Sequence, residues 1–154
     1  MLYIDSDGVI ADFYGWCRTF DPEIDCTDSD KIRRLMVEHA SECFLTCKKL
    51  PKAEGFLQAI RENDGIMVLT ALTPVEKLAR YCSKRQARRI AAVHRENKYR
   101  WFEMHGVPRS KVIITSGSTS KAAYCHKGDC LIDDYAKNIE EWQAAGGIGV
   151  LHVI

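Results

Sequence analysis

The sequence predicts an α/β fold, a Rossmann-like three-layer sandwich in which helices cover both faces of a central parallel sheet. Short apolar runs alternate along the chain with longer amphipathic stretches, a pattern typical of strands alternating with helices. The chain has 154 residues, 46% of them apolar and 28% charged, so it is long enough for one globular domain with a small insert.

Turn and cap residues divide the first half of the chain into a strand, three helices and a second strand. Asp28 or Ser29 can cap the second helix, Pro51 ends it, and the third helix stops at Asn63-Asp64-Gly65. The predicted ranges are 2–5 for the first strand, 11–20 for a helix, 21–30 for a polar loop, about 28 to 47 and 53–62 for two more helices, and 65–70 for the second strand.

Proline and glycine divide the second half in the same way. Pro74 suits the first turn of a helical stretch, in one or two pieces, which Gly106-Val107-Pro108 ends. Gly146-Gly147 closes a later helix. The predicted ranges are 74–105 for the helical stretch, 111–115 and 130–133 for two strands, 135–145 for the later helix, and 148–154 for a last apolar strand.

Charge and hydropathy set aside several classes of protein. The net charge of +1 gives no global attraction to nucleic acid or to a membrane. No apolar run approaches the ~20 residues of a membrane span, so no membrane partner is expected. The N-terminus enters a strand at once, without the regions of a signal peptide. The seven cysteines are odd in number and contain no CxxC pair, which indicates reduced thiols in a cytoplasmic protein.

One group of possible metal ligands lies in the second predicted helix. His39, Cys43 and Cys47 are four residues apart and would share one face of a helix, where they could bind a metal. No fourth ligand is evident, which favours the alternative, a buried stripe of small residues.

Two carboxylates follow the first strand directly, in Asp5-Ser6-Asp7-Gly8-Val9. Acids beside a buried strand are costly unless a cation or a reaction needs them. One carboxylate can attack phosphorus, and the second can protonate the leaving oxygen and later activate water. The alternative is an Asx-type turn with no chemical role.

The ends of two other predicted strands, and one loop, supply further polar groups. Asp133 and Asp134 suit a hard divalent cation such as Mg²⁺, although either acid could instead cap the helix that follows. The Thr70 hydroxyl could bond a phosphate oxygen, although Thr is also simply common in strands. Lys121, after the loop Gly117–Ser120, could neutralise a phosphate, or could be a solvated loop lysine. Ligands bind beyond the carboxyl ends of parallel strands, so we expect these groups in one crevice.

In this order, the residues resemble the four motifs of the haloacid dehalogenase-like (HAD) phosphatase superfamily, and the resemblance covers nearly the whole chain. The matching segments are Asp5-Ser6-Asp7-Gly8-Val9, Val68-Leu69-Thr70, Lys121, and Asp133-Asp134. The resemblance implies that Asp5 is the nucleophile and Asp7 the general acid and base. It also implies Mg²⁺ held by the Asp5 carboxylate, the Asp7 carbonyl and an aspartate of the last motif, with Asp134 favoured and Asp133 in support.

A narrower resemblance is to the 5'(3')-deoxyribonucleotidases and their short phage and bacterial relatives. It rests on the segments Asp7–Phe13, Lys98–Phe102 and Leu131–Asp134, followed by Asn138-Ile139 and Trp142. It implies that Phe13 stacks on the nucleobase and that Lys98 lies near the phosphate. After Thr70 this group often has Ser, whereas this chain has Ala71, which leaves only the backbone N–H there as a donor to the phosphate.

The same resemblance implies a small helical cap inserted after the first strand. The cap would span residues 14–50, and residues 1–13 and 51–154 would form the catalytic core. Three aromatic residues of the cap, Trp16, Phe20 and Phe44, could line a base pocket or could pack the core of the cap itself.

A basic stretch lies in the long helical region. Residues 84–100 contain seven Lys or Arg residues and a single acid, Glu96. The simpler interpretation is a solvated helix face, and the alternative is a field that attracts anionic substrates or a nucleic-acid end.

Three functions are consistent with these residues. The favoured one is Mg²⁺-dependent hydrolysis of (deoxy)nucleoside monophosphates through an aspartyl-phosphate. The alternatives are a polynucleotide 3'-phosphatase, which would use the basic helix to hold a strand, and a nucleotide-binding protein without turnover on the same fold.

Overall fold

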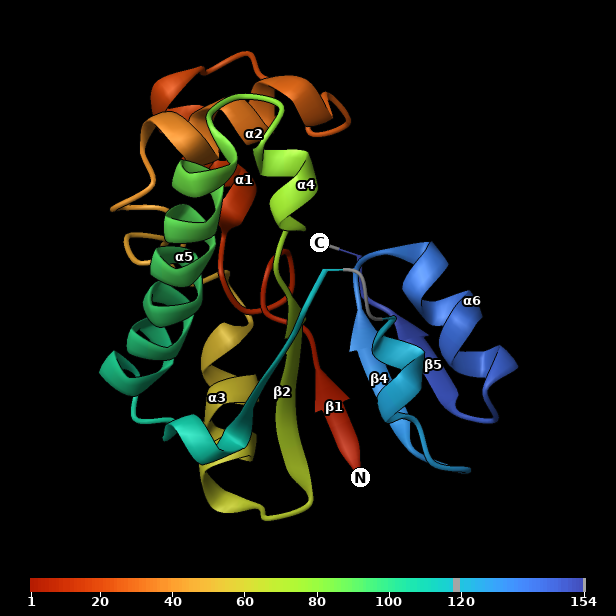
Figure 1. Ribbon diagram of the computed structural model, residues 1–154. Coiled ribbons are helices and arrows are strands. Elements are labelled where there is room, and N and C mark those ends of the chain that lie inside the picture. The colour runs from red at the N-terminus through yellow and green to blue at the C-terminus, as the bar shows by residue number, and fades with distance from the viewer. Residues whose placement is uncertain (118–119, 154) are drawn as a thin grey trace.

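The computed structural model describes residues 1–117 and 120–153 and has the predicted α/β architecture (Figure 1). The strands are β1 (Leu2–Ile4), β2 (Ile66–Ala71), β3 (Val112–Thr115), β4 (Cys130–Asp133) and β5 (Ile148–Leu151). In the described part of the chain they form one parallel sheet of five strands in the order β3-β2-β1-β4-β5. The chain moves outward from β1 in one direction and from β4 in the other, and the crevice at such a switch point is where open parallel sheets bind ligands.

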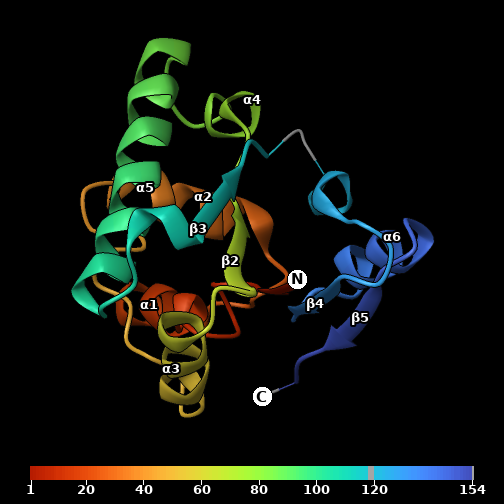
Figure 2. The ribbon, with the colours of Figure 1, turned by 90° about the horizontal axis from the view of Figure 1, so that it is seen from below.

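Helices lie on both faces of this sheet. Figure 2 shows α3 and α5 on one side and α6 on the other, in agreement with the contacts of α3 with β2, of α5 with β3, and of α6 with β4 and β5. The helices are α1 (Phe13–Phe20), α2 (Ser29–Glu38), α3 (Ala53–Glu62), α4 (Val75–Leu78), α5 (Lys84–Met104) and α6 (Ala136–Ala144), with short 3₁₀ turns η1 (Arg109–Lys111) and η2 (Lys121–Tyr124). The helical stretch predicted from residue 74 is therefore the pair α4 and α5.

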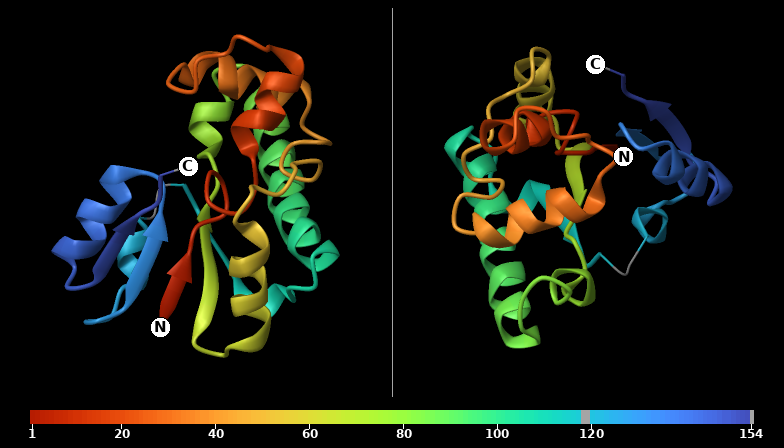
Figure 3. Two further views of the ribbon diagram at one scale, coloured as in Figure 1. Left: turned by 180° about the vertical axis from the view of Figure 1, so that it is seen from behind. Right: turned by 90° about the horizontal axis from the view of Figure 1, so that it is seen from above.

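The main apolar core runs continuously from the sheet into the segment predicted as a cap. One cluster contains Ile4 and Val68 of the central strands together with Leu57 of α3, Trp16 of α1 and Met36 of α2. Figure 3, seen from above, shows the orange α2 crossing over the ends of the central strands. Residues 14–50 thus share their apolar core with the sheet that they cover.

The second helix is shorter than predicted, and this prediction was wrong beyond Glu38. His39 ends α2, and the chain continues in turns that bring Phe44 to a φ of 69°. The Ser41 and Cys43 carbonyls, which a longer helix would have bonded internally, instead accept hydrogen bonds from the side chain of Asn97 on α5. Long-range hydrogen bonds of this kind replace the local ones that a longer helix would have made.

His39, Cys43 and Cys47 consequently do not share a helix face. The His39 ring stacks on Phe20, with ring centroids 3.8 Å apart. Cys43 and Cys47 are buried, and burial raises the pKa of both thiols, which favours their protonated form. All seven cysteines are free thiols in the structure.

The last strand is also shorter than the predicted range of 148–154. β5 ends at Leu151, after which the His152 amide donates to the carbonyl of Asp133, and Ile154 lies outside the described residues. No helix in the described part of the chain is both long enough and apolar enough to span a membrane.

A buried histidine should make stability depend on pH. His94 is 1% exposed, its Nε2 lies 3.1 Å from the Met36 carbonyl, and burial lowers its pKa to about 4. Between pH 6.5 and 4 the unfolded chain binds a proton that the folded protein does not, so stability falls as the pH falls. We expect a loss of roughly 2 kcal/mol between pH 7 and pH 5 from this group.

Chemical unfolding of wild type and His94→Gln at both pH values tests this expectation. The glutamine amide can still donate to Met36 but does not titrate, so the variant should lack this part of the acid-induced loss. Equal losses in the two proteins would contradict the assignment to His94.

Candidate active site

A cleft of about 820 Å³ opens at the carboxyl ends of β1, β2 and β4. The predicted site residues that line it are Asp5, Asp7, Phe13, Thr70, Ala71, Lys121, Asp133 and Asp134. The strand ends therefore bring these side chains into one crevice, as expected from a parallel sheet. Lys98, the remaining predicted site residue, lies behind this lining.

Lys121 joins the ends of β1 and β4. Its Nζ donates to Asp5 Oδ1 at 2.8 Å and to Asp133 Oδ2 at 2.7 Å, and the residue is only 4% exposed. Asp133 is held in turn by the Asn138 amide (3.1 Å) and by the Tyr135 backbone N–H (2.9 Å). Asp133 thus positions Lys121 and accepts a hydrogen bond from Tyr135, the N-cap residue of α6, which itself has no side-chain cap bond, and the part of Asp133 in binding a cation stays a prediction.

Lys98 reaches from the middle of α5 to the ends of β1 and β2. Its Nζ donates to Asp7 Oδ2 at 2.8 Å, to Thr70 Oγ1 at 2.7 Å and to the Ala71 carbonyl at 3.0 Å. These three bonds use all three hydrogens of the ammonium group. In the structure Lys98 therefore contacts Asp7, the residue predicted to be the general acid and base. The expected position of Lys98 beside a phosphate stays a prediction.

Burial and the close packing of acids shift the pKa of three groups in the cleft. Burial, with Asp133 and Asp7 nearby, raises the pKa of Asp5 although Lys121 opposes the shift. Burial and the Asp133 and Asp7 carboxylates raise the pKa of Asp134 to about 6. Burial alone would lower the pKa of Lys121, but Asp5 and Asp133 outweigh it and raise that pKa. Asp5 and Asp134 are therefore costly to ionise without a further cation.

Three of these acids can hold a metal ion. Asp5, Asp133 and Asp134 each offer a carboxylate oxygen, and these oxygens lie within 4.8 Å of one another. With all four carboxylates ionised, counting Asp7, the ammonium groups of Lys98 and Lys121 balance two negative charges, and a bound divalent cation would balance the other two. Hard oxygen donors fit Mg²⁺. Both oxygens of Asp133 accept hydrogen bonds, whereas no side chain of the described residues donates to Asp134, which makes Asp134 the freer ligand.

Gly8 leaves the space that the Asp134 carboxylate occupies. Its φ of 81° is a left-handed conformation, and a Cβ built on it would lie 1.9 Å from Asp134 Oδ2. We expect Gly8→Ala to displace Asp134 and to weaken Mg²⁺ binding by about 10- to 100-fold, with a loss of roughly 1–2 kcal/mol of stability from the strained backbone.

Calorimetric titration of Mg²⁺ measures this effect. Gly55→Ala is the matched control, because a Cβ at Gly55 meets nothing within 4 Å. Undiminished Mg²⁺ affinity in Gly8→Ala would show that Asp134 does not bind the ion.

The cleft extends into a recess of about 210 Å³ beneath α2. Phe13, Phe44, Ile32 and Met36 give it apolar walls, and Phe13 and Phe44 are stacked with centroids 5.2 Å apart. Polar groups at the recess include Arg33 and Tyr14, whose pKa is raised to about 12 by burial and nearby acids, so that its hydroxyl stays a donor. The sequence analysis did not identify Arg33, Tyr14, Cys26 or Asn138 as site residues. The 3.6-residue spacing of Ile32 and Met36 marks a buried helix face, but gives no sign of what it faces.

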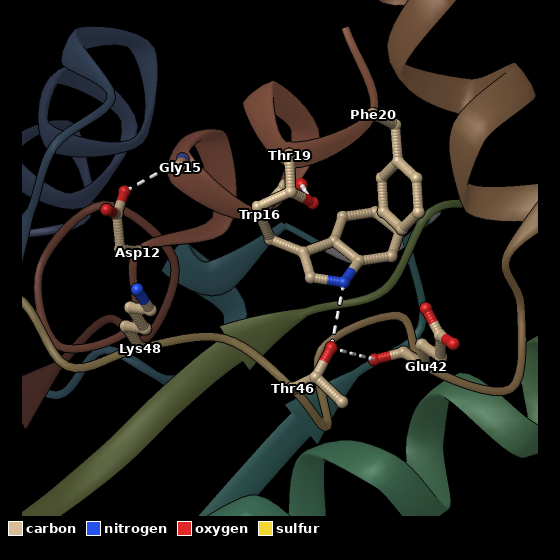
Figure 4. Close-up of a pocket in the computed structure, with 8 residues that line it drawn as sticks. All are labelled: Asp12, Gly15, Trp16, Thr19, Phe20, Glu42, Thr46 and Lys48. Carbon is tan, nitrogen blue, oxygen red and sulfur yellow. Dashed lines mark hydrogen bonds between the residues drawn. The ribbon is translucent and has the colours of Figure 1, made fainter. Parts of the chain in front are cut away.

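Trp16 and Phe20 line a different cavity. Figure 4 shows them with Thr46, Glu42, Asp12 and Lys48 around a pocket of about 260 Å³ between α1 and residues 42–48. Trp16 Nε1 donates to Thr46 Oγ1 at 2.9 Å. Of these three aromatic residues, Phe44 lines the recess, whereas Trp16 and Phe20 edge this outer pocket, and Trp16 also stacks on Phe13.

Comparisons with known proteins do not assign a function to the chain. No protein-family model matches the chain, and no curated protein does. Among solved structures, the HAD domain of effector protein Lem4 from Legionella pneumophila is similar over 98% of this chain and 83% of that domain, with 14% identity and a TM-score of 0.41. Similarity of this degree assigns no activity, so function has to be inferred from the residues of the cleft.

Proposed function

We propose that this protein is a Mg²⁺-dependent phosphomonoester hydrolase that acts on (deoxy)nucleoside monophosphates through an aspartyl-phosphate on Asp5. The observation that carries the proposal is the pair of neighbouring acids at the end of β1, each bonded to its own buried lysine. Asp5 is bonded to Lys121 and Asp7 to Lys98, and both acids line one cleft. A nucleophile beside a second acid is the arrangement that two-step phosphate hydrolysis needs.

Asp5 acts as the nucleophile in this proposal. Its Oδ1 accepts from the Ser6 amide and from Lys121, both at 2.8 Å, while no hydrogen bond to Oδ2 is recorded within residues 1–117 and 120–153. Oδ2 attacks phosphorus, the bond to the leaving oxygen breaks, and an acyl phosphate forms. Lys121 stabilises the charge that gathers on the phosphoryl oxygens.

Asp7 transfers the proton in both steps. It protonates the leaving oxygen of the nucleoside, then takes a proton from the water that attacks the acyl phosphate, which releases phosphate and restores the Asp5 carboxylate. Lys98 holds Asp7 at 2.8 Å. Because Lys98 also donates to Thr70 Oγ1, the Thr70 hydroxyl hydrogen is free to bond a phosphoryl oxygen.

The Asp5 carboxylate, the Asp7 carbonyl and Asp134 would hold the Mg²⁺ ion, with Asp133 in support. When bound, the ion would withdraw charge from the phosphoryl oxygens and balance the excess of acids at the strand ends.

A nucleoside is the leaving group that best fits the recess. Phe13 and Phe44 stack on each other, are 8% and 5% exposed, and together with Ile32 and Met36 give the recess beside Asp7 an apolar lining. A nucleobase can bury its apolar faces against this lining, whereas the hydroxyl groups of a sugar phosphate would lose their hydrogen bonds to water there.

A substrate panel tests the proposal. Phosphate release is measured from 3'- and 5'-deoxynucleoside and ribonucleoside monophosphates and from a hexose phosphate, with Mg²⁺ and with a chelator. We expect nucleotides to be hydrolysed fastest and release to stop with the chelator. Equal rates on the hexose phosphate would reject the nucleotide pocket. Tight nucleotide binding without release from any compound would instead identify a binding protein.

A further inference from the structure

We propose that a basic strip beside the cleft binds the phosphodiester backbone of a single-stranded nucleic acid, so that the terminal phosphate of a strand enters the active site. The inference rests on the proposed function of the cleft, and it extends the substrate from a mononucleotide to the phosphorylated end of a polynucleotide. The basic strip consists of Lys77 and Arg80 on and just after α4 and of Lys84, Arg85, Arg88 and Arg89 on α5.

The strip is continuous with the cleft. Lys77 lines the cleft itself, as does Arg33 from α2. The helix α4 contacts α5 and lies between the N-terminal turns of α5 and the end of β2 (Figures 1 and 2). A strand whose last phosphate reaches Asp5 could therefore leave the cleft past Lys77 and continue over the first turns of α5.

The basic residues at the start of α5 do not stabilise the helix that contains them. Lys84 and Arg88, and likewise Arg85 and Arg89, are like charges four residues apart, which destabilise a helix. They also stand in the first two turns of α5, where the helix dipole favours acids, and the first turn contains none. Ser83 and Gln86 cap the helix with a neutral pair. An external anion would turn each of these costs into an attraction.

The strip is not balanced from within the fold. None of its six side chains forms an ion pair with an acid of the described residues, although Arg61, Arg109 and Lys49 elsewhere all do. All six are exposed. The acids nearest in sequence are Glu76, which forms no ion pair with a described residue, and Glu96, which is engaged by Arg109; Asp30 is brought close by the fold and accepts from the Tyr81 hydroxyl. The positive field is therefore directed to solvent.

A nucleic-acid strand suits this surface better than an anionic membrane. Membrane-binding basic helices carry large apolar side chains beside the charges. None of the strongly exposed large apolar residues of the described chain lies within residues 77–89. The basic strip also leads into a cleft that would bind a phosphate monoester, and binding to a membrane surface would not involve that cleft.

Binding is measured by fluorescence anisotropy of labelled thymidylates of one, two, four and eight nucleotides with a terminal phosphate at either end. Asp5→Asn protein is used so that the phosphate is not removed. We expect affinity to rise at least about 10-fold from dinucleotide to octanucleotide at 50 mM salt.

In Arg88→Gln/Arg89→Gln the slope of log affinity against log salt should be lower by about 1.4, because each phosphate contact on a single strand contributes about 0.7. Lys52→Gln/Lys127→Gln, with the same change in charge at exposed lysines elsewhere, should keep the wild-type slope.

Turnover provides the second measurement. With Asp5 intact, we expect Arg88→Gln/Arg89→Gln to lower the ratio of kcat/KM for the octanucleotide to kcat/KM for the mononucleotide by about 10-fold. Equal affinity for all lengths, or an unchanged salt slope in the double variant, would overturn strand binding even if mononucleotides are hydrolysed. Binding to phosphatidylserine vesicles in place of the octanucleotide would overturn it in favour of a membrane. Length-dependent binding without phosphate release would support the strip and reject the proposed hydrolysis.

Discussion

Asp5→Asn is expected to lower kcat for nucleotide hydrolysis by at least about 10⁴-fold, because the amide cannot attack phosphorus and no acyl phosphate can form. Lys121 and Asp133 remain paired at 2.7 Å in the variant, so the cleft should keep its shape. The loss is measured as phosphate release at saturating nucleotide and Mg²⁺. Residual activity above about 1% of wild type would mean that another group, or water, attacks first.

The same substitution should raise stability at high pH. Because the pKa of Asp5 is raised in the folded protein, the unfolded chain loses this proton at a lower pH than the folded one. The contribution of Asp5 to the stability of the metal-free wild type therefore falls as the pH rises from about 4 to about 8, in the opposite direction to the contribution of His94, which both proteins share. Asp5→Asn removes this dependence, so it should unfold at higher denaturant than wild type at pH 8, and the two proteins should converge near pH 4.

Asp64→Asn is the matched control, because Asp64 lies in an exposed turn before β2. It should change neither turnover nor the pH dependence of stability. If Asp5→Asn were less stable than wild type at pH 8, its lost activity would have to be attributed to a disturbed fold. A gain in stability together with lost activity is the signature of a residue kept for chemistry at a cost to folding.

Much of the sheet could be predicted because its signals are local. Apolar runs bounded by Gly, Pro or acid identified every strand, and β4 begins and ends at the predicted residues. In a parallel sheet the ends of such strands must meet, so Asp5, Thr70 and Asp133 could be expected in one crevice without knowledge of the strand order. The order β3-β2-β1-β4-β5, which places the switch between Asp5 and Asp133, became visible only with the structure.

The remaining features depend on contacts between distant segments. The end of α2 at Glu38 is favoured by hydrogen bonds from Asn97, 54 and 56 positions away in sequence from the carbonyls that it binds. The outer pocket beside Trp16 and the recess beside Phe13 are separated by the way α1 packs, which helical spacing alone does not give. The partner of Lys98 is likewise 91 positions away, and no pattern near either residue indicates the pair.

Lys98→Met should lower turnover of nucleotides by about 10²- to 10³-fold, because the substitution leaves Asp7 without the ammonium group that holds it. Misplacing a general acid costs most when the leaving group needs a proton. A nucleoside alkoxide needs one, whereas the nitrophenolate of p-nitrophenyl phosphate departs without help. The loss on p-nitrophenyl phosphate should therefore stay below about 10-fold. Arg100→Met, at an exposed position on the same helix, is the control and should affect neither substrate.

This difference between substrates decides what Lys98 does. If Lys98 binds the phosphate itself, as the resemblance to deoxyribonucleotidases implies, both substrates lose the same contact and both rates should fall alike. If Lys98 acts through Asp7, Asp7→Asn should reproduce the nucleotide-selective loss, and Asp7→Asn/Lys98→Met should be little worse than Asp7→Asn alone, since the two side chains work as a unit. The 2.8 Å bond to Asp7, and the use of the other two ammonium hydrogens by Thr70 and the Ala71 carbonyl, favour the second outcome. The lysine on α5 would then be a positioning residue, which holds the proton donor in place from behind the cleft.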